Sequence, residues 1–420
     1  MTDSVRNNEP HANPTGPLRG VRVLEIGHYI AAPHCTMMLA DQGADVIKVE
    51  PVGGEPGRKA PPFSDSGESL AFACHNRGKR SVTIDLTKPE SREALDALLR
   101  WADIVVTNYT YGIPEKLGFG FERLSKVNPR AVMVHVTGYS TAGSRRDHGA
   151  FDPAIQAMSG FCDLTGEPDG APQISQFFLA DHSAAMNAAY AAMCALWERE
   201  RTGKARKIEV NMLEAMTSQL SYHIPSKGMM NLKPTRRKAP SATGLPHVYQ
   251  AKDVPVLVML TTVPTWTKFC RLIGREDWIG DGKKVPQLSK VPEHLAEVKA
   301  CIDAWFAART AGEAYRVLQD AGIVAGAFRS VSDLYDEEMA ENSGVIAFVD
   351  LSKGGPPVPV PGPAFRTAEP GSVLPKVPGL GDDGYDILLE LGLTEVALQK
   401  LGIARKLDAP TPDRAVAAPG

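Results

Sequence analysis

The chain has 420 residues, which is too long for one ordinary domain and predicts two or three domains. Hydrophobic residues make up 43% and charged residues 23%, as in a typical globular protein, and a net charge of −3 disfavours nucleic acid and anionic membranes as main partners. The six cysteines are scattered without a close pair, which argues against a zinc site and a disulfide framework and favours a reducing, cytoplasmic location.

The ends of the chain and its most apolar window give no sign of a targeting segment. Residues 1–17 are polar, lack the apolar core of a secretory signal and are expected to be disordered, as is the Ala/Pro-rich tail at 409–420. The window 184–197 is too short to span a membrane and is interrupted by Asn187. We therefore expect no membrane partner and interpret this window as a buried helix.

The first half of the chain alternates between strand-like and helix-like sequence. A β-branched run at 21–27 predicts a buried strand, 33–43 a helix with Pro near its start and Gly at its end, and 45–50 a second strand. The alternation continues with strands at 82–85, 104–107 and 131–136 and helices at 91–101 and 121–127. Repeated β-α-β units predict an open parallel sheet flanked by helices, which is a Rossmann-like α/β domain.

Ligands of such sheets bind beyond the carboxyl ends of the strands. The candidate ligand-facing loops are therefore 27–32, 50–59, 108–111 and 137–139. The first strand is not followed by a G-x-G-x-x-G sequence, so a dinucleotide site in its usual form is disfavoured. Glu50 stands where an NAD protein carries its ribose-binding acid, but without the glycines this signal is weak.

Composition changes after Leu220, which predicts a second, smaller domain. Residues 225–243 are rich in Lys, Arg, Pro and Gly and are expected to form a linker or a mobile loop. The remaining predicted elements are strands at 248–250, 256–261 and 346–351, helices at 265–272, 295–308, 310–321, 332–342, 385–392 and 394–401, and a proline-rich crossing segment at 356–363. The expected division is a large Rossmann-like domain at 18–224, a small α+β domain at 225–330 and a return segment at 331–408 that completes the large domain.

Asp181 stands where an apolar run turns into a long helix-forming segment. Its plainest interpretation is a helix N-cap, because an Asp oxygen accepts hydrogen bonds from free backbone N–H groups. A helix N-terminus also lowers the pKa of a carboxylate, and an ionised, partly desolvated carboxylate can attack an activated acyl group. Position alone leaves both interpretations open.

Several short motifs, spread over nearly the whole chain, are jointly specific. They are L-R-G-V-R-V-L-E at 18–25, L-A-D-Q-G-A-D-V-I-K-V-E at 39–50, N-R-G-K-R-S at 76–81, F-D at 151–152, Q-A-M-S-G at 156–160, T-G at 165–166, A-D at 180–181, T-G-K at 202–204 and L-E-A at 213–215. In this set the chain resembles the class III CoA-transferases, the group that includes formyl-CoA transferase and carnitine CoA-transferase. The resemblance implies that Asp181 is the catalytic nucleophile.

The resemblance also implies a reaction. Enzymes of this family move CoA from an acyl-CoA to a free carboxylic acid through an aspartyl mixed anhydride and an aspartyl-CoA thioester, which is covalent catalysis. We expect coenzyme A esters and a small carboxylic acid as substrates, no tightly bound cofactor and no metal. The family forms interlocked homodimers, and the proline-rich stretch at 356–363 fits an extended crossing.

The resemblance also implies which residues contact CoA, and at two of these positions this chain differs from the family's pattern. The predicted CoA-binding residues are Tyr29, Ile30, Arg58, Lys79, Arg80, Asn108 and Gly138, with the three cations placed for phosphates. Ile30 stands where the family often has Gln, and Thr107-Asn108-Tyr109 replaces the usual E-N-F without the Arg that follows it. The Gly138 amide and the amides after Asp181 are candidates for stabilising an oxyanion.

Two other functions remain open. α-Methylacyl-CoA racemases share the fold and the Asp, but they carry a His where this chain has Phe151, and Phe cannot accept a proton. His148 or His182 could replace that His, so a 2-methylacyl-CoA racemase or epimerase is the first alternative. A non-catalytic CoA-binding protein is the second. The stretch 261–265 lacks the glycine-rich loop of formyl-CoA transferase, so formate and oxalate are not assigned as substrates.

Overall fold

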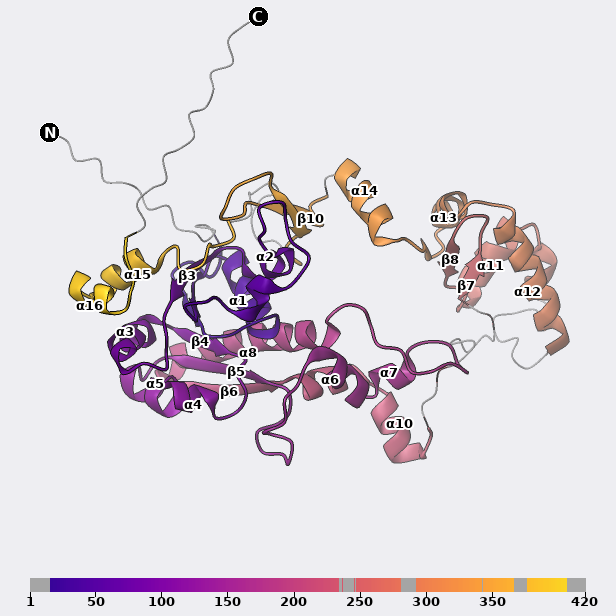
Figure 1. Cartoon of the computed structure of the whole chain (residues 1–420). Helices are drawn as coiled ribbons and strands as arrows, with labels where there is room; N and C mark the ends of the chain where they lie inside the picture. The colour runs from indigo at the N-terminus through magenta and orange to yellow at the C-terminus, as the bar shows by residue number, and fades with distance from the viewer. Residues whose placement is uncertain are drawn as a thin grey trace, which may run out of the picture. The chain divides into compact units, whose positions relative to one another are not determined.

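A computed structural model describes residues 16–233, 236, 245, 247–280, 292–341, 343–365 and 376–405 (Figure 1). The chain divides into two units. Unit 1 comprises residues 1–162, 174–232 and 343–420, and unit 2 comprises 163–173 and 233–342. Most of the N-terminal stretch and all of the C-terminal tail for which disorder is expected lie outside the described residues. The domain limits at 225 and 330 stay predictions.

Unit 1 is built on a parallel sheet, as predicted, and this sheet has six strands. Its strands are β1 (Arg22–Glu25), β2 (Asp45–Glu50), β3 (Lys79–Thr83), β4 (Ile104–Thr107), β5 (Val132–Thr137) and β6 (Arg206–Asn211). They lie in the order β3-β2-β1-β4-β5-β6, and every neighbouring pair is parallel. The order reverses between β1 and β4, and such a reversal is where open α/β sheets bind their ligands.

Helices cover both faces of this sheet, because alternate side chains of each strand point to opposite faces. On one face, Val23 and its equivalents pack against α1 (Ala31–Asp41) and α8 (Leu179–Thr202). On the other face, Leu24 and its equivalents pack against α3 (Arg92–Trp101), α5 (Phe121–Val127), α15 (Gly384–Glu390) and α16 (Glu395–Lys400). The predicted α/β class is confirmed.

The remaining elements of unit 1 are short. They are α2 (Leu70–Asn76), α4 (Ile113–Leu117), α6 (Asp152–Met158), α9 (Met212–Ser218), α10 (His223–Met230), the antiparallel pair β10 (Ile346–Val349) and β11 (Val358–Pro361), and two 3-10 turns at Pro56–Lys59 and Pro89–Ser91; α7 (Phe161–Leu164) lies where unit 1 passes into unit 2.

Unit 2 has its own core and an antiparallel sheet. The sheet has the order β7-β8-β9, with β7 (Val248–Gln250), β8 (Pro255–Val258) and β9 (Ala325–Ala327). The helices are α11 (Val263–Leu272), α12 (Pro292–Ala307), α13 (Ala311–Asp320) and α14 (Val331–Glu341), with a 3-10 turn at Glu276–Trp278. Trp266 and Trp278 stack with ring centroids 5.9 Å apart at the centre of the core.

Two sequence predictions about elements were wrong. The strand predicted at 82–85 is β3 and begins at Lys79, because polar side chains of this strand are buried among charged partners and hide the apolar pattern. The region 225–243, interpreted as a loop, begins within helix α10, and most of its remainder lies outside the described residues. The proline-rich segment at 356–363 contains β11, an extended strand that pairs with β10, and its role as a crossing stays a prediction.

No helix in the described parts of the chain is both long enough and apolar enough to cross a membrane.

Candidate active site

A small cavity opens at the carboxyl edge of the sheet, beside the reversal of strand order. Its volume is about 80 Å³. It is lined by His28, Tyr29, Ala31, Asn108, Tyr109, Thr110, Tyr111, Val136, Thr137, Gly138, Arg146, His148, Ala150, Phe151, Asp181 and Met212. Three of the four loops expected to face a ligand, those after β1, β4 and β5, therefore meet around Asp181.

Asp181 lies in the first turn of α8 and is not its N-cap. The helix begins at Leu179, and the N-cap residue is Phe178. The interpretation of Asp181 as a cap was therefore wrong by three positions. Its carboxylate is free to line the cavity while its backbone N–H belongs to the helix terminus.

The carboxylate that caps α8 comes from Asp152, at the start of α6. Its Oδ2 atom accepts hydrogen bonds from the backbone N–H groups of Ala180 at 2.6 Å and Asp181 at 3.1 Å. The Asp152 side chain is buried, and its Oδ1 accepts from the side-chain Nε2 of Gln156, whose Oε1 accepts from the Ser175 N–H at 2.9 Å. A fixed second carboxylate thus lies behind the backbone of Asp181.

This arrangement raises the pKa of Asp181 to about 7. The larger cause is burial, which disfavours the charged form, and the second is the negative charge of Asp152. The expectation that the helix terminus would lower this pKa was wrong, because Asp152 takes up the N–H groups that would otherwise stabilise the Asp181 charge.

Tyr29 is held in the wall of the cavity by an unusual backbone conformation. Its φ angle is +59°, and its N–H donates to Glu55 Oε2 at 3.0 Å. Its ring lies edge-on to Phe151, with centroids 6.2 Å apart. The next residue, Ile30, is the N-cap position of α1 and does not line the cavity.

Asn108 joins the loops that follow β1 and β4. Its Oδ1 accepts from the His28 N–H at 3.0 Å, and its Nδ2 donates to the His28 carbonyl at 2.8 Å. Gly27 must be glycine here, because a Cβ atom would lie 2.8 Å from Asn108 Oδ1. The two loops at the strand-order reversal are therefore fixed to each other.

Gly138 leaves β5 at the floor of the cavity. A Cβ atom on this residue would lie 2.1 Å from the Cβ of Ala150, so only glycine allows the following loop to fold back over the strand. Gly138 therefore brings Ala150 and Phe151 towards Asp181.

The three cations predicted to bind CoA phosphates are all engaged with carboxylates and do not line this cavity. Arg58 holds Glu50 through two bonds of 2.7 Å, and Arg80 pairs with Asp45 and Glu390. Lys79 has no exposed surface, and its Nζ lies 2.7 Å from Glu25 Oε2. Phosphate contacts of these residues stay predictions, and Lys79 is shielded from solvent in this structure.

Sequence reasoning did not assign a role to Arg146, which also lines the cavity. Its guanidinium lies 5.1 Å from the ring centroid of Tyr111 and pairs with Asp147. The polar stretch Arg145–His148 after β5 was the available signal. His148 reaches the same cavity, whereas His182, the other candidate proton acceptor, does not line it.

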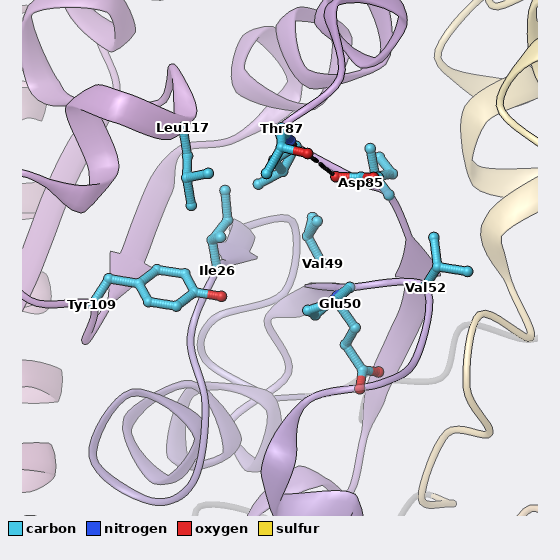
Figure 2. Close-up of a pocket in the computed structure, with 11 residues that line it drawn as sticks. Ile26, Val49, Glu50, Val52, Asp85, Thr87, Tyr109 and Leu117 are labelled. Carbon is cyan, nitrogen blue, oxygen red and sulfur yellow. Dashed lines mark hydrogen bonds between the residues drawn. The ribbon is translucent and has the colours of Figure 1, made fainter.

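A second cavity, of about 280 Å³, opens at the ends of β1, β2 and β3 (Figure 2). It is lined by Ile26, Val49, Glu50, Pro51, Val52, Ile84, Asp85, Leu86, Thr87, Tyr109 and Leu117. Figure 2 shows the Tyr109 phenol pointing into it, beside Ile26 and Glu50. Because Tyr109 lines both cavities, they are neighbours along the sheet edge.

Comparison with known proteins establishes the family to which the chain belongs. The model of CoA-transferase family III matches residues 18–384, so the chain belongs to that family, as its motifs predicted. It is 31% identical over 404 residues to succinyl-CoA–D-citramalate CoA-transferase of Chloroflexus aurantiacus, covering 93% of this chain and 98% of that one.

Other relatives agree. Identity to succinyl-CoA:mesaconate CoA-transferase of Haloarcula hispanica is 28% over 395 residues, which covers 90% of this chain and 97% of that enzyme. The structure matches a crystal structure of a CAIB/BAIF family protein from Brucella suis with a TM-score of 0.76 and 28% identity, covering 90% of this chain and 99% of that one. The expectation of a CoA-transferase is confirmed.

Proposed function

We propose that this CoA-transferase uses Asp181 as the nucleophile that carries CoA from an acyl-CoA to a free carboxylic acid. The observation that supports the proposal is the position of this carboxylate, which lines the cavity at the sheet's carboxyl edge and has a pKa of about 7. A carboxyl group with a pKa near 7 is ionised in a large fraction of molecules at neutral pH. Its carboxylate is more basic, and so more nucleophilic, than that of an ordinary Asp.

The proposed steps balance without a metal or an oxidant. An Asp181 oxygen attacks the thioester carbonyl, the C–S bond breaks, and CoA thiolate leaves a mixed anhydride. The thiolate then attacks the aspartyl carbonyl, and the donor acid leaves as a carboxylate. The acceptor carboxylate attacks the aspartyl-CoA thioester, whose C–S bond breaks to give a second mixed anhydride and CoA thiolate. This thiolate attacks the acceptor carbonyl, which forms the new acyl-CoA and releases the Asp181 carboxylate.

The protein groups around Asp181 suit this sequence. Each tetrahedral intermediate places negative charge on an oxygen, which backbone N–H donors can stabilise. Gly138 lines the cavity and its N–H is the proposed donor, and Asp152 binds the backbone at the start of α8. Fixing the nucleophile next to a bound thioester replaces a bimolecular encounter with an intramolecular reaction.

We place the nucleotide half of CoA in the larger cavity. Its lining is mainly apolar, which suits a base, and it shares Tyr109 with the Asp181 cavity. Adenosine 3′,5′-bisphosphate should then compete with acyl-CoA. Val52→Glu, at an exposed rim position, should raise KM for acyl-CoA by roughly tenfold through repulsion of the phosphates. Val396→Glu, equally exposed on α16, is the matched control, and equal effects of both would refute the placement.

The position of Arg146 supports the proposal that the acceptor acid carries a second carboxylate. Its guanidinium matches a carboxylate in geometry and charge, and it is exposed in the cavity wall. Arg146→Met should raise KM for a dicarboxylic acid more than for a monocarboxylic acid of similar length. An equal effect on both acids would contradict this assignment.

The central test is mass spectrometry of the intact protein after incubation with a panel of acyl-CoAs, followed by hydroxylamine. A CoA adduct that maps to Asp181 and is absent in Asp181→Ala would support the covalent route. Absence of any adduct, together with deuterium uptake at C2 of a branched acyl-CoA, would favour the racemase alternative, which the presence of His148 in the same cavity keeps in consideration. CoA binding without either reaction would favour a binding protein.

We also propose a homodimer and a cytoplasmic location. Met186, Tyr190 and Trp197 are exposed along one side of α8, which fits burial against a second copy. All six cysteines are free thiols, as a reducing compartment allows.

A further inference from the structure

Three histidines from three different helices meet beneath the start of α8. They are His34 of α1, His75 of α2 and His182 of α8. The Nδ1 atoms of His34 and His75 are 3.3 Å apart, and the His182 ring centroid lies 4.7 Å from that of His34. One ring nitrogen of each residue lies within 4.8 Å of the other two. All three rings are partly buried, and none lines either cavity described above.

Lys79 binds backbone carbonyls next to and within this histidine cluster. Its Nζ atom donates to the carbonyls of Pro33 and His75, each at 2.8 Å. It therefore fixes the residue before His34 and the backbone of His75 in relation to each other. Alanines of α1 and α8, among them Ala32 and Ala184, pack in one core, which fixes His182 against His34. The cluster is thus pre-formed by rigid elements.

The electrostatic surroundings leave the three imidazoles neutral. Burial is the main cause that lowers the pKa of all three rings, to about 3 for His34. The cations Arg77 and Lys79 lower the pKa values of His34 and His75 further, whereas the Phe178 carbonyl and the Asp152 charge partly offset burial at His182. The nearby cations are compensated, because Arg77 pairs with Asp41 at 2.7 Å and Lys79 pairs with Glu25. Unprotonated ring nitrogens with no uncompensated charge beside them are suitable metal ligands.

We propose that His34, His75 and His182 bind one divalent transition-metal ion of the Zn²⁺ type. Three imidazoles are an established ligand set for Zn²⁺, with Zn–N distances of about 2.0–2.1 Å and a fourth position for water. Drawing the nitrogens into such a set requires movements of roughly 1 Å, which side-chain rotation can provide. Imidazole ligands favour Zn²⁺, Co²⁺, Ni²⁺ and Cu²⁺ over Mg²⁺ and Ca²⁺.

Such an ion would connect the three helices and would not take part in the proposed transfer. Its bonds would join α1, α2 and α8 near the cavity walls that they support. Because metal binding to the folded state alone stabilises that state, the melting temperature should rise with metal concentration.

The test uses the full-length protein without an affinity tag, stripped with EDTA and titrated with Zn²⁺ or Co²⁺ alone. We expect one ion per chain, an intense visible absorption of the Co²⁺ form, which indicates tetrahedral coordination, and displacement of Co²⁺ by Zn²⁺. His75→Gln and His182→Gln should each weaken binding by more than roughly tenfold. His223→Gln, at a histidine of α10 outside the cluster, should bind as the unchanged protein does.

Two results would overturn the proposal. One is a stripped, folded protein that binds no Zn²⁺ or Co²⁺ at concentrations well above that of the protein. The other is binding that survives in both cluster variants. If a variant fails to fold by circular dichroism, imidazole NMR of the unchanged protein decides instead. Zn²⁺ should then shift the ring signals of three histidines, and a shift of others alone would refute the site.

Discussion

At the scale of single residues, the protonation of Asp181 should govern the pH dependence of the reaction. Only the carboxylate is nucleophilic, and burial together with Asp152 raises its pKa to about 7. kcat/KM should therefore increase by roughly tenfold per pH unit below pH 7 and level off above it. The profile should be measured with EDTA present, so that no cation at the neighbouring histidines contributes. A flat profile between pH 5 and 8, a range of about three units around the midpoint, would contradict this role.

Asp152 offers a way to shift that profile. Asp152→Asn removes the negative charge but keeps an oxygen that can accept from the Ala180 and Asp181 N–H groups. The midpoint should move to lower pH, by about one unit or less, because burial, the larger cause, remains. Asp386→Asn changes an exposed acid of α15 that does not line the cavity and is the control. An unchanged midpoint in Asp152→Asn would mean that Asp152 acts on Asp181 through geometry alone.

At the scale of elements, Lys79 holds together β1, β3, α1 and α2. It contacts Glu25 of β1 and the carbonyls of Pro33 and His75, and Lys48 lies 2.5 Å from the other oxygen of Glu25. Burial opposes the charge of Glu25, but the two lysines outweigh it and lower the Glu25 pKa to about 2. These charges are therefore part of the folded framework.

The Lys79→Met variant should consequently unfold more easily than the unchanged protein. Removing one partner of a buried ion pair typically costs about 3–5 kcal/mol. Here Glu25 would keep only Lys48, and the carbonyls of Pro33 and His75 would lose their donor. The melting temperature should fall by roughly 5 °C or more. Arg80→Met, on the same strand with a partly exposed ion pair, should cost about 1 kcal/mol or less. If Lys79→Met instead leaves stability intact and raises KM for acyl-CoA, the phosphate-binding prediction for Lys79 is supported.

The sequence allowed the sheet and much of the site to be predicted, because both depend on local patterns. Parallel strands end at one edge, so Tyr29, Asn108, Gly138 and Asp181 could be expected to meet there. Asp152, by contrast, acts on a backbone 28 residues away. No periodicity or spacing rule reports such a contact.

The same limit explains why no metal site was expected from the sequence. His34, His75 and His182 come from three helices and have none of the short spacings that mark metal motifs. The late start predicted for β3 has a related origin, because a buried lysine looks like a surface residue until its distant partner is known.

At the scale of the whole molecule, α8 offers the surface expected for association. Trp197 and Tyr190 are 70% and 72% exposed, although large aromatic side chains usually find cover. For the proposed homodimer, Trp197→Glu should lower the mass from that of a dimer towards that of a monomer in light scattering coupled to gel filtration. Val396→Glu changes a similarly exposed apolar residue of α16 and should leave the mass unchanged. A Trp197→Glu protein that keeps the mass of the unchanged protein would place the interface elsewhere.

The C-terminal segment at 376–383 affects how the chain folds during its synthesis. Its residues complete β3, since the Gly78 N–H donates to the Lys376 carbonyl at 3.0 Å and the Ser81 N–H donates to Asp383 Oδ2 at 2.7 Å. During synthesis the ribosome releases these partners only after the whole of unit 2 has emerged. The edge strand β3 therefore stays uncovered until the last part of the nascent chain has been made. An interrupted translation product would expose this strand edge, and exposed strand edges promote aggregation.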